Sequence, residues 1–198
     1  MYDERLADFS RERLDGRPVP DDLRILLVAQ WEGRTDFTDL LVLEFFEAGE
    51  VHPLLDTSYL SETELADPEM QAINAAAAEM ATYVKLVAKG GKGWIGYWLH
   101  PDEPTDRAWH LTELDTEFTF WRPVGLTLAE GAAAERAGYQ DEPDERIAFT
   151  QLAAELAELG LPLSTHDYDA LDDTEYRVAP EELMEELIEA EREKRGLR

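Results

Sequence analysis

The chain contains no cysteine among its 198 residues. This absence excludes disulfide bonds, thiolate metal sites and thiol nucleophiles, although it does not reveal the redox compartment. Long apolar runs are also missing, because no stretch approaches the roughly 18 to 20 uninterrupted apolar residues of a membrane span. The first 16 residues lack the apolar core of a signal peptide. We therefore expect a cytoplasmic protein that does not associate with membranes.

Basic residues are scarce. Lys and Arg together number 18 against 45 Asp and Glu, which gives a formal net charge of −27. The excess is spread along the chain, since residues 1–125 carry 25 acidic and 11 basic side chains and residues 126–198 carry 20 and 7. Such a field repels phosphate backbones and anionic membranes and steers basic proteins toward the surface. Nucleic-acid binding is disfavoured, and the charge serves a basic partner, solubility or a high-salt cytoplasm.

The length and the 44% hydrophobic content suffice for one domain with a substantial core, or for a core domain with a helical extension. We expect a core domain over residues 1–139 and a C-terminal helical extension over residues 140–198. Apolar stripes favour docking of the extension on the core. These stripes comprise Ile147, Leu152 and Leu156 in one helix and Leu183, Leu187 and Ile188 in the next.

Apolar periodicity and helix start and stop signals predict helices over residues 3–14, 21–33, 36–49, 68–81, 127–137, 145–159 and 180–194. The segment 36–49 also fits a strand, but its length and the potential caps Asp36 and Thr38 favour a helix.

Four β-type runs follow the fourth of these segments. Residues 83–88 and 94–99 flank the glycine-rich loop 89–93, and residues 108–113 and 117–121 flank a turn at Asp115 and Thr116. They predict an α+β fold in which an antiparallel meander of about four strands packs against helices. Alternation places Trp109, Leu111, Phe118 and Phe120 toward one layer and His110, Thr112, Glu117, Thr119 and Trp121 toward the other.

The motifs that resemble cofactor or metal sites lack the flanking structure or the residue spacing that such sites require. Residues 91–96 match the dinucleotide fingerprint G-x-G-x-x-G, but that mechanism needs glycines that lead from a strand into a helix. Here they lead into a strand, so we interpret them as a hairpin turn that needs positive φ. An EF-hand starting at Asp167 would place Asp172 where glycine is required. The four histidines show no short metal-binding spacing, so we expect neither a cofactor nor a metal.

Catalytic motifs are equally weak. No serine lies in a G-x-S-x-G elbow, and there is no cysteine. Asp115 and Glu117 could act as general acid and base, but close carboxylate pairs arise by chance in a chain with 45 of them. We therefore expect no catalytic residues, and a carboxylate-dependent hydrolase ranks third among the candidate functions.

Several motifs occur in an order that resembles the SUKH superfamily of bacterial immunity and interaction proteins. They are Pro20-Asp-Asp-Leu-Arg-Ile-Leu-Leu27, Gly93-Trp-Ile-Gly-Tyr-Trp98, Leu114-Asp-Thr-Glu117 and Thr127-Leu-Ala-Glu130. The similarity covers roughly residues 18–137; segment 36–66 lacks the glycine-rich turn common in the family, and residues 140–198 lie outside the pattern. The resemblance implies an α+β domain that binds a protein partner without catalysis, and in many members this partner is a toxin.

We accordingly expect an immunity-type protein that neutralises a cationic toxin domain, the alternative being a regulatory or scaffold module whose charge serves solubility. If the strands pair as a meander, one sheet face gathers aromatic anchors among acids, a mixture enriched at binding hot spots. The predicted partner-binding residues are Tyr83, Trp94, Trp98, His110, Glu117 and Trp121. The alternative for this face is burial as ordinary core beneath helices of the extension.

Overall fold

The computed structural model describes residues 2–47, 49–104, 109–118, 120–123, 125–139, 144–171 and 175–197. Its helices are α1 (Asp3–Arg13), α2 (Asp21–Trp31), α3 (Asp36–Leu41), α4 (Glu62–Ala66), α5 (Pro68–Tyr83), α6 (Leu128–Ala137), α7 (Asp144–Glu158) and α8 (Pro180–Arg195), with 3-10 turns η1 (Pro53–Leu55) and η2 (Tyr168–Ala170). Its strands are β1 (Glu44–Phe45), β2 (Val84–Lys89), β3 (Gly93–Trp98), β4 (His110–Asp115) and β5 (Trp121–Pro123). The predicted α+β class is confirmed.

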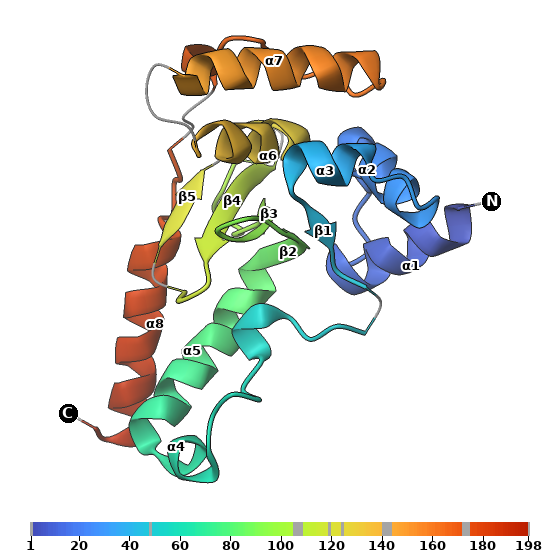
Figure 1. The fold of residues 1–198 in the computed structure, drawn as a ribbon. Helices are drawn as coiled ribbons and strands as arrows, with labels where there is room; N and C mark the ends of the chain where they lie inside the picture. The colour runs from blue at the N-terminus through green and yellow to red at the C-terminus, as the bar shows by residue number, and fades with distance from the viewer. Residues whose placement is uncertain are drawn as a thin grey trace.

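The strands form one antiparallel sheet in the order β1-β2-β3-β4-β5 (Figure 1). The meander is therefore as predicted, with one additional strand. That strand corrects the prediction for residues 36–49, because the helix ends at Leu41 and Val42 adopts the left-handed conformation with φ of 54°. Glu44 and Phe45 then pair with Lys89 and Ala88. This apolar segment therefore leaves the helix and pairs with the edge of the sheet at β2.

The last predicted strand, 117–121, is wrong by several residues. Thr116 to Phe118 form the turn, and β5 starts at Trp121, which pairs with Leu114. The backbone N–H of Phe120 donates to Oδ1 of Asp115 at 3.1 Å, so the carboxylate closes a wider turn than the two-residue turn expected. Phe120 consequently lies exposed instead of in a layer, and Thr119 falls outside the described residues.

The glycine-rich loop between β2 and β3 is a hairpin, as predicted, but not for the predicted reason. Its glycines do not have positive φ. Glycine is required at Gly93 because a Cβ there would lie 2.0 Å from the backbone carbonyl oxygen of Leu114. A Cβ on Gly91 would lie 2.1 Å from the Tyr139 hydroxyl, the end of a side chain that can move aside. The hairpin therefore packs directly against β4 and the end of α6.

Two hydrophobic clusters lie on opposite faces of the sheet. The larger one joins α1, α2, α3, α6 and α7 to Ile95, Tyr97 and Leu111. The smaller one joins α5 and α8 to Leu86, Trp98 and Leu114. Adjacent residues of β3 and β4 thus alternate between the two clusters, as a pleated strand requires.

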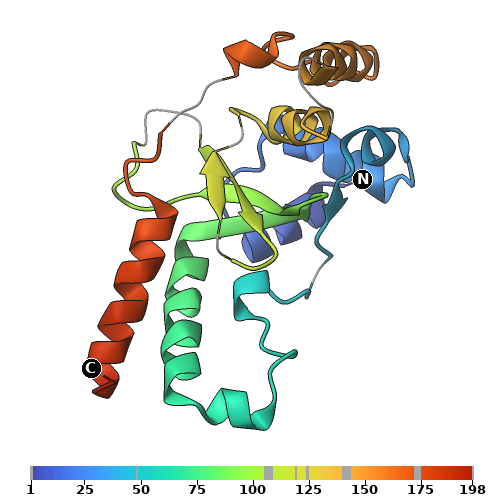
Figure 2. The same cartoon turned by 60° about the vertical axis from the view of Figure 1, so that its left-hand side comes forward.

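Both helices of the C-terminal extension pack on the rest of the chain. In Figure 1, α7 lies across α6 and α8 runs beside α5, and Figure 2 shows the same pairing of α5 with α8. The predicted stripe of α7 is correct at Leu156, which is fully buried, and at Leu152, which is partly buried, but wrong at Ile147, which is exposed. Phe149 and Ala153 complete the buried face. Alanine supplies part of the buried face, which an apolar pattern based on large residues overlooks. In α8, Leu183 and Leu187 pack on the smaller cluster. No helix among the described residues has the length and apolar character needed to cross a membrane.

Candidate functional site

The six predicted partner-binding residues divide into two groups. Trp98, His110 and Trp121 are buried, and Tyr83 packs edge-on against Trp98 with ring centroids 6.1 Å apart. Trp94 and Glu117 instead line an open groove at the other end of the same face. The sheet therefore brings the predicted aromatic residues onto one face, but it leaves only part of that face accessible.

Residues 175–181 pack over Trp98, His110 and Trp121; we call them the C-terminal strap. The Tyr176 hydroxyl donates to Oγ1 of Thr112 at 2.7 Å, and burial raises the pKa of Tyr176. The Val178 N–H donates to Oε1 of Glu103 at 2.9 Å. These bonds join the strap to β4 and to the loop before it.

The strap is also tied to the edge of the sheet, where the backbone N–H of Trp121 donates to Oε1 of Glu181 at 3.0 Å. Trp98 is 1% exposed and Trp121 is 5% exposed beneath this cover. The predicted binding role of these two residues and of His110 is therefore corrected: their side chains belong to the core, because the extension covers them.

The open groove has a volume of about 810 Å³. We call it the acidic aromatic groove, and its lining comprises Phe46, Glu50, Val51, Pro53, Asp56, Ser58, Tyr59, Lys89, Trp94, Thr116, Glu117 and Phe118. One wall is the β4–β5 turn together with β3, and the other is the segment around η1. In Figure 2 this segment passes beneath the β4–β5 turn.

The aromatic wall of the groove is a stacked pair. The rings of Trp94 and Phe118 lie 5.1 Å apart between centroids and 13° from parallel. Phe118 reaches this position with φ of 60°, a left-handed conformation that costs a bulky residue about 1–2 kcal/mol. Backbone strain of this kind is concentrated at functional sites, where the surrounding structure holds it in place.

The opposite wall is fixed by His52. Its Nδ1 accepts a hydrogen bond from the Leu54 N–H at 3.2 Å, and its Nε2 lies 3.3 Å from the Val84 carbonyl oxygen, to which it donates. Burial lowers the pKa of His52 to about 4, so the imidazole is neutral at pH 7. This neutral ring joins η1 to β2, while Val51 and Tyr59 beside it remain 60% and 68% exposed.

Charge is distributed unevenly along the groove. Nζ of Lys89 lies 3.2 Å from Glu50 and 3.7 Å from Glu44, and 5.3 Å from the centre of the Phe46 ring. Asp56 and Glu117, which also line the groove, take part in no ion pair with any of the described residues. The groove therefore offers aromatic surface beside carboxylates that lack a cation in the described part of the chain.

Two further sequence-based expectations concern a carboxylate pair and a metal site. Of the pair considered for acid and base roles, Asp115 accepts a hydrogen bond from the Phe120 N–H in the β4–β5 turn, and Glu117 is exposed and lines the groove. Within the described ranges, no group of three His, Asp or Glu side chains is placed to hold a metal ion.

Sequence reasoning missed the wall formed by residues 50–59. This segment includes three large apolar side chains that the structure leaves exposed, Val51, Leu55 and Tyr59. The sequence signal that could have identified this wall is a group of apolar residues that has neither helical nor alternating spacing and that Pro53 interrupts. Comparison of the chain with family models, curated proteins and solved structures found no match.

Proposed function

We propose that this chain is a protein-binding protein that neutralises a basic protein partner by occluding it, as an immunity protein does for a toxin, and that it acts without catalysis. The observation that carries the proposal is the acidic aromatic groove, which exposed Tyr59 and the Trp94–Phe118 stack line together with carboxylates. Aromatic anchors of this kind supply much of the binding energy at protein interfaces.

The charge of the chain supports the same function. A net charge of −27 accelerates encounter with a cationic protein and excludes anionic partners. The resemblance to the SUKH superfamily, an expectation from the sequence, agrees with binding in place of catalysis. Tight occlusion of a toxin domain also requires a partner surface of complementary charge, and such a partner would be a cationic domain.

A regulatory or scaffold module is the second candidate. The exposed carboxylates Glu155 and Glu158 lie on α7, which packs on α6 across the sheet from the groove (Figure 1). Charge in that position cannot contact a partner held in the groove, so under this alternative it serves solubility. This alternative keeps the fold and the groove but removes the neutralising role.

The test uses the product of the gene adjacent to this one in its native genome. We expect that protein to be basic and to arrest growth when expressed alone, and we expect co-expression of the full-length chain to restore growth. Association of the two purified proteins should slow steeply as salt rises, because screening shortens the reach of the field. Failure to restore growth, or an association rate indifferent to salt, would overturn the proposal.

A matched pair of charge reversals locates the contact. Glu117→Lys lies in the groove and Glu158→Lys lies on α7, and both side chains are exposed, so the two variants share net charge and differ only in position. We expect Glu117→Lys to speed dissociation and Glu158→Lys to alter only the association rate. Equal effects on dissociation would remove the groove from the interface.

A further inference from the structure

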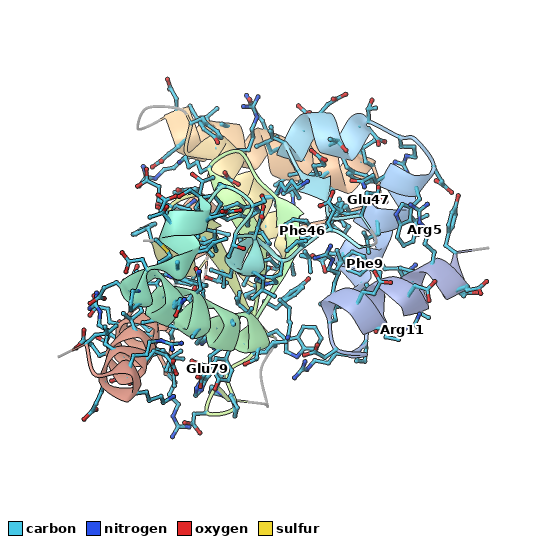
Figure 3. The ribbon with its side chains drawn as sticks, turned by 90° about the horizontal axis from the view of Figure 1, so that it is seen from below. Arg5, Phe9, Arg11, Phe46, Glu47 and Glu79 are labelled. Atoms are coloured by element: carbon cyan, nitrogen blue, oxygen red, sulfur yellow. The ribbon has the colours of Figure 1, made fainter. Side chains whose placement is uncertain are left out.

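The chain repeatedly places its own cations on aromatic rings next to carboxylates. The Arg5 guanidinium lies 4.2 Å from the centre of the Trp31 ring and 3.6 Å from Glu47, and Figure 3 shows Arg5 and Glu47 in this region of the molecule. The Arg34 guanidinium lies 5.0 Å from the centre of the Phe37 ring and 2.6 Å from Asp36. Aromatic faces attract cations because of their quadrupole, and adjacent carboxylates add to that attraction.

The Trp94–Phe118 stack has the aromatic and acidic parts of this arrangement without the cation. Glu117 precedes Phe118 and lines the groove with it. Among the described residues, no cation lies over either ring and none pairs with Glu117. Lys89, the one cation in the lining of the groove, is the cross-strand partner of Trp94, but its ammonium group is held by Glu44 and Glu50 and lies over the Phe46 ring.

We propose that the Trp94–Phe118 stack is the receptor for an arginine side chain of the basic partner, with Glu117 balancing its charge. This inference rests on the proposed function and specifies its chemistry. The guanidinium group is planar and weakly hydrated, so it stacks on aromatic surface more effectively than the compact, strongly hydrated ammonium of lysine. The groove that the stack lines is open to solvent, and Tyr59 on its lining is 68% exposed, so such a side chain can enter.

The receptor is formed before binding. Trp94 pairs with Leu114 in the sheet, and the absence of a side chain on Gly93 lets β3 approach the Leu114 carbonyl closely. The left-handed conformation of Phe118 then turns its ring back onto Trp94. Because both rings are already stacked, binding an arginine costs little additional ordering.

Three hexapeptides serve as probes: acetyl-(Gly-Arg)3-amide, acetyl-(Gly-Lys)3-amide and acetyl-(Gly-citrulline)3-amide. Citrulline keeps the planar shape of arginine and lacks its charge. Each is titrated into the full-length protein labelled with 15N, and the indole N–H signals of the tryptophans are followed by NMR. We expect the arginine peptide to shift the Trp94 signal and to bind roughly fivefold more tightly than the lysine peptide, with the citrulline peptide weakest.

Two phenylalanines in the same turn provide matched variants. Phe118→Leu removes one ring of the stack, and Phe120→Leu removes an exposed ring that does not line the groove. We expect Phe118→Leu and Glu117→Gln each to weaken arginine-peptide binding about fivefold, and Phe120→Leu to leave it unchanged. The backbone NMR spectrum of each variant shows that it is folded.

The inference is overturned if the citrulline peptide binds as tightly as the arginine peptide, if Phe118→Leu binds normally, or if the shifts lie on α7 or α8. Its failure is distinct from failure of the proposed function. Growth rescue together with peptide binding that ignores Phe118 would remove the arginine receptor and keep the function. Peptide binding at Trp94 without growth rescue would keep the arginine receptor and remove the proposed function.

Discussion

Two ends of one sheet face differ in what covers them. Trp94 and Trp98 lie on the same strand and point to the same side, since both pack with the smaller hydrophobic cluster. Trp98 lies beneath the C-terminal strap and is 1% exposed, whereas Trp94 borders the acidic aromatic groove. The two ends are similar in residue type, so aromatic content alone does not distinguish core from binding surface. The difference is made by a segment about 80 residues further along the chain.

The largest expected effect comes from removing the cover. Truncation after Tyr139 deletes Phe149 and Leu156, both fully buried, together with the strap and α8. Burial of each such side chain contributes about 1.5–3 kcal/mol, so we expect loss of cooperative folding or insoluble protein. Circular dichroism during heating measures this, with deletion of residues 196–198 as the control. An unfolding curve like that of the full chain would show that the extension is independent.

Substitution of the two tryptophans compares the ends directly. Trp98→Ala leaves a cavity in the smaller cluster and should lower the free energy of unfolding by about 3–5 kcal/mol. Trp94→Ala should cost clearly less, because that ring is only partly buried and one side borders the groove. Urea denaturation of the two variants measures the difference. Equal losses would mean that both ends of the face are core.

Acid should weaken the wall of the groove formed around η1. The folded pKa of His52 is about 4 against an ordinary value of 6.5, so the unfolded chain binds more protons between these values. This contribution is complete above pH 6.5 and falls as pH drops toward 4, with a loss of about 2 kcal/mol at pH 5. The variant His52→Asn does not titrate there. Its free energy of unfolding, measured in urea, should change less than that of the parent chain between pH 7 and pH 5; parallel changes would contradict the assignment.

The smallest expected effect concerns one bond of the strap. Tyr176→Phe removes the hydrogen bond to Thr112 and should lower the free energy of unfolding by about 1 kcal/mol. Tyr59→Phe is the control, because Tyr59 is 68% exposed in the groove. Thermal unfolding should separate the two variants, and equal melting temperatures would show that the Tyr176 hydroxyl does not fasten the strap.

The sequence predicts most of the helices because their signals are local. Asp21 and Gly33 bracket α2, and Pro68 begins α5. The β4–β5 turn was misjudged because its shape depends on a side-chain bond from Asp115 to a residue five positions away.

The candidate site was harder to predict than the fold. Alternation correctly grouped Trp94 with Trp98, but no local pattern shows which of them a distant strap covers. The apolar residues of the wall over residues 50–59 follow neither a helical nor an alternating period. The position of this wall therefore depends on tertiary contacts such as that of His52 with Val84. Long-range coverage and the path of irregular segments are therefore the parts that a single sequence leaves open.

Hydrogen exchange of the full-length chain, alone and with its basic partner, tests the central claim most directly. If the uncovered end of the face is the binding surface, backbone amides of residues 50–59 and 116–118 will exchange more slowly in the complex, while those of α7 will not change. Protection confined to α7 or α8, with the groove unaffected, would contradict the account.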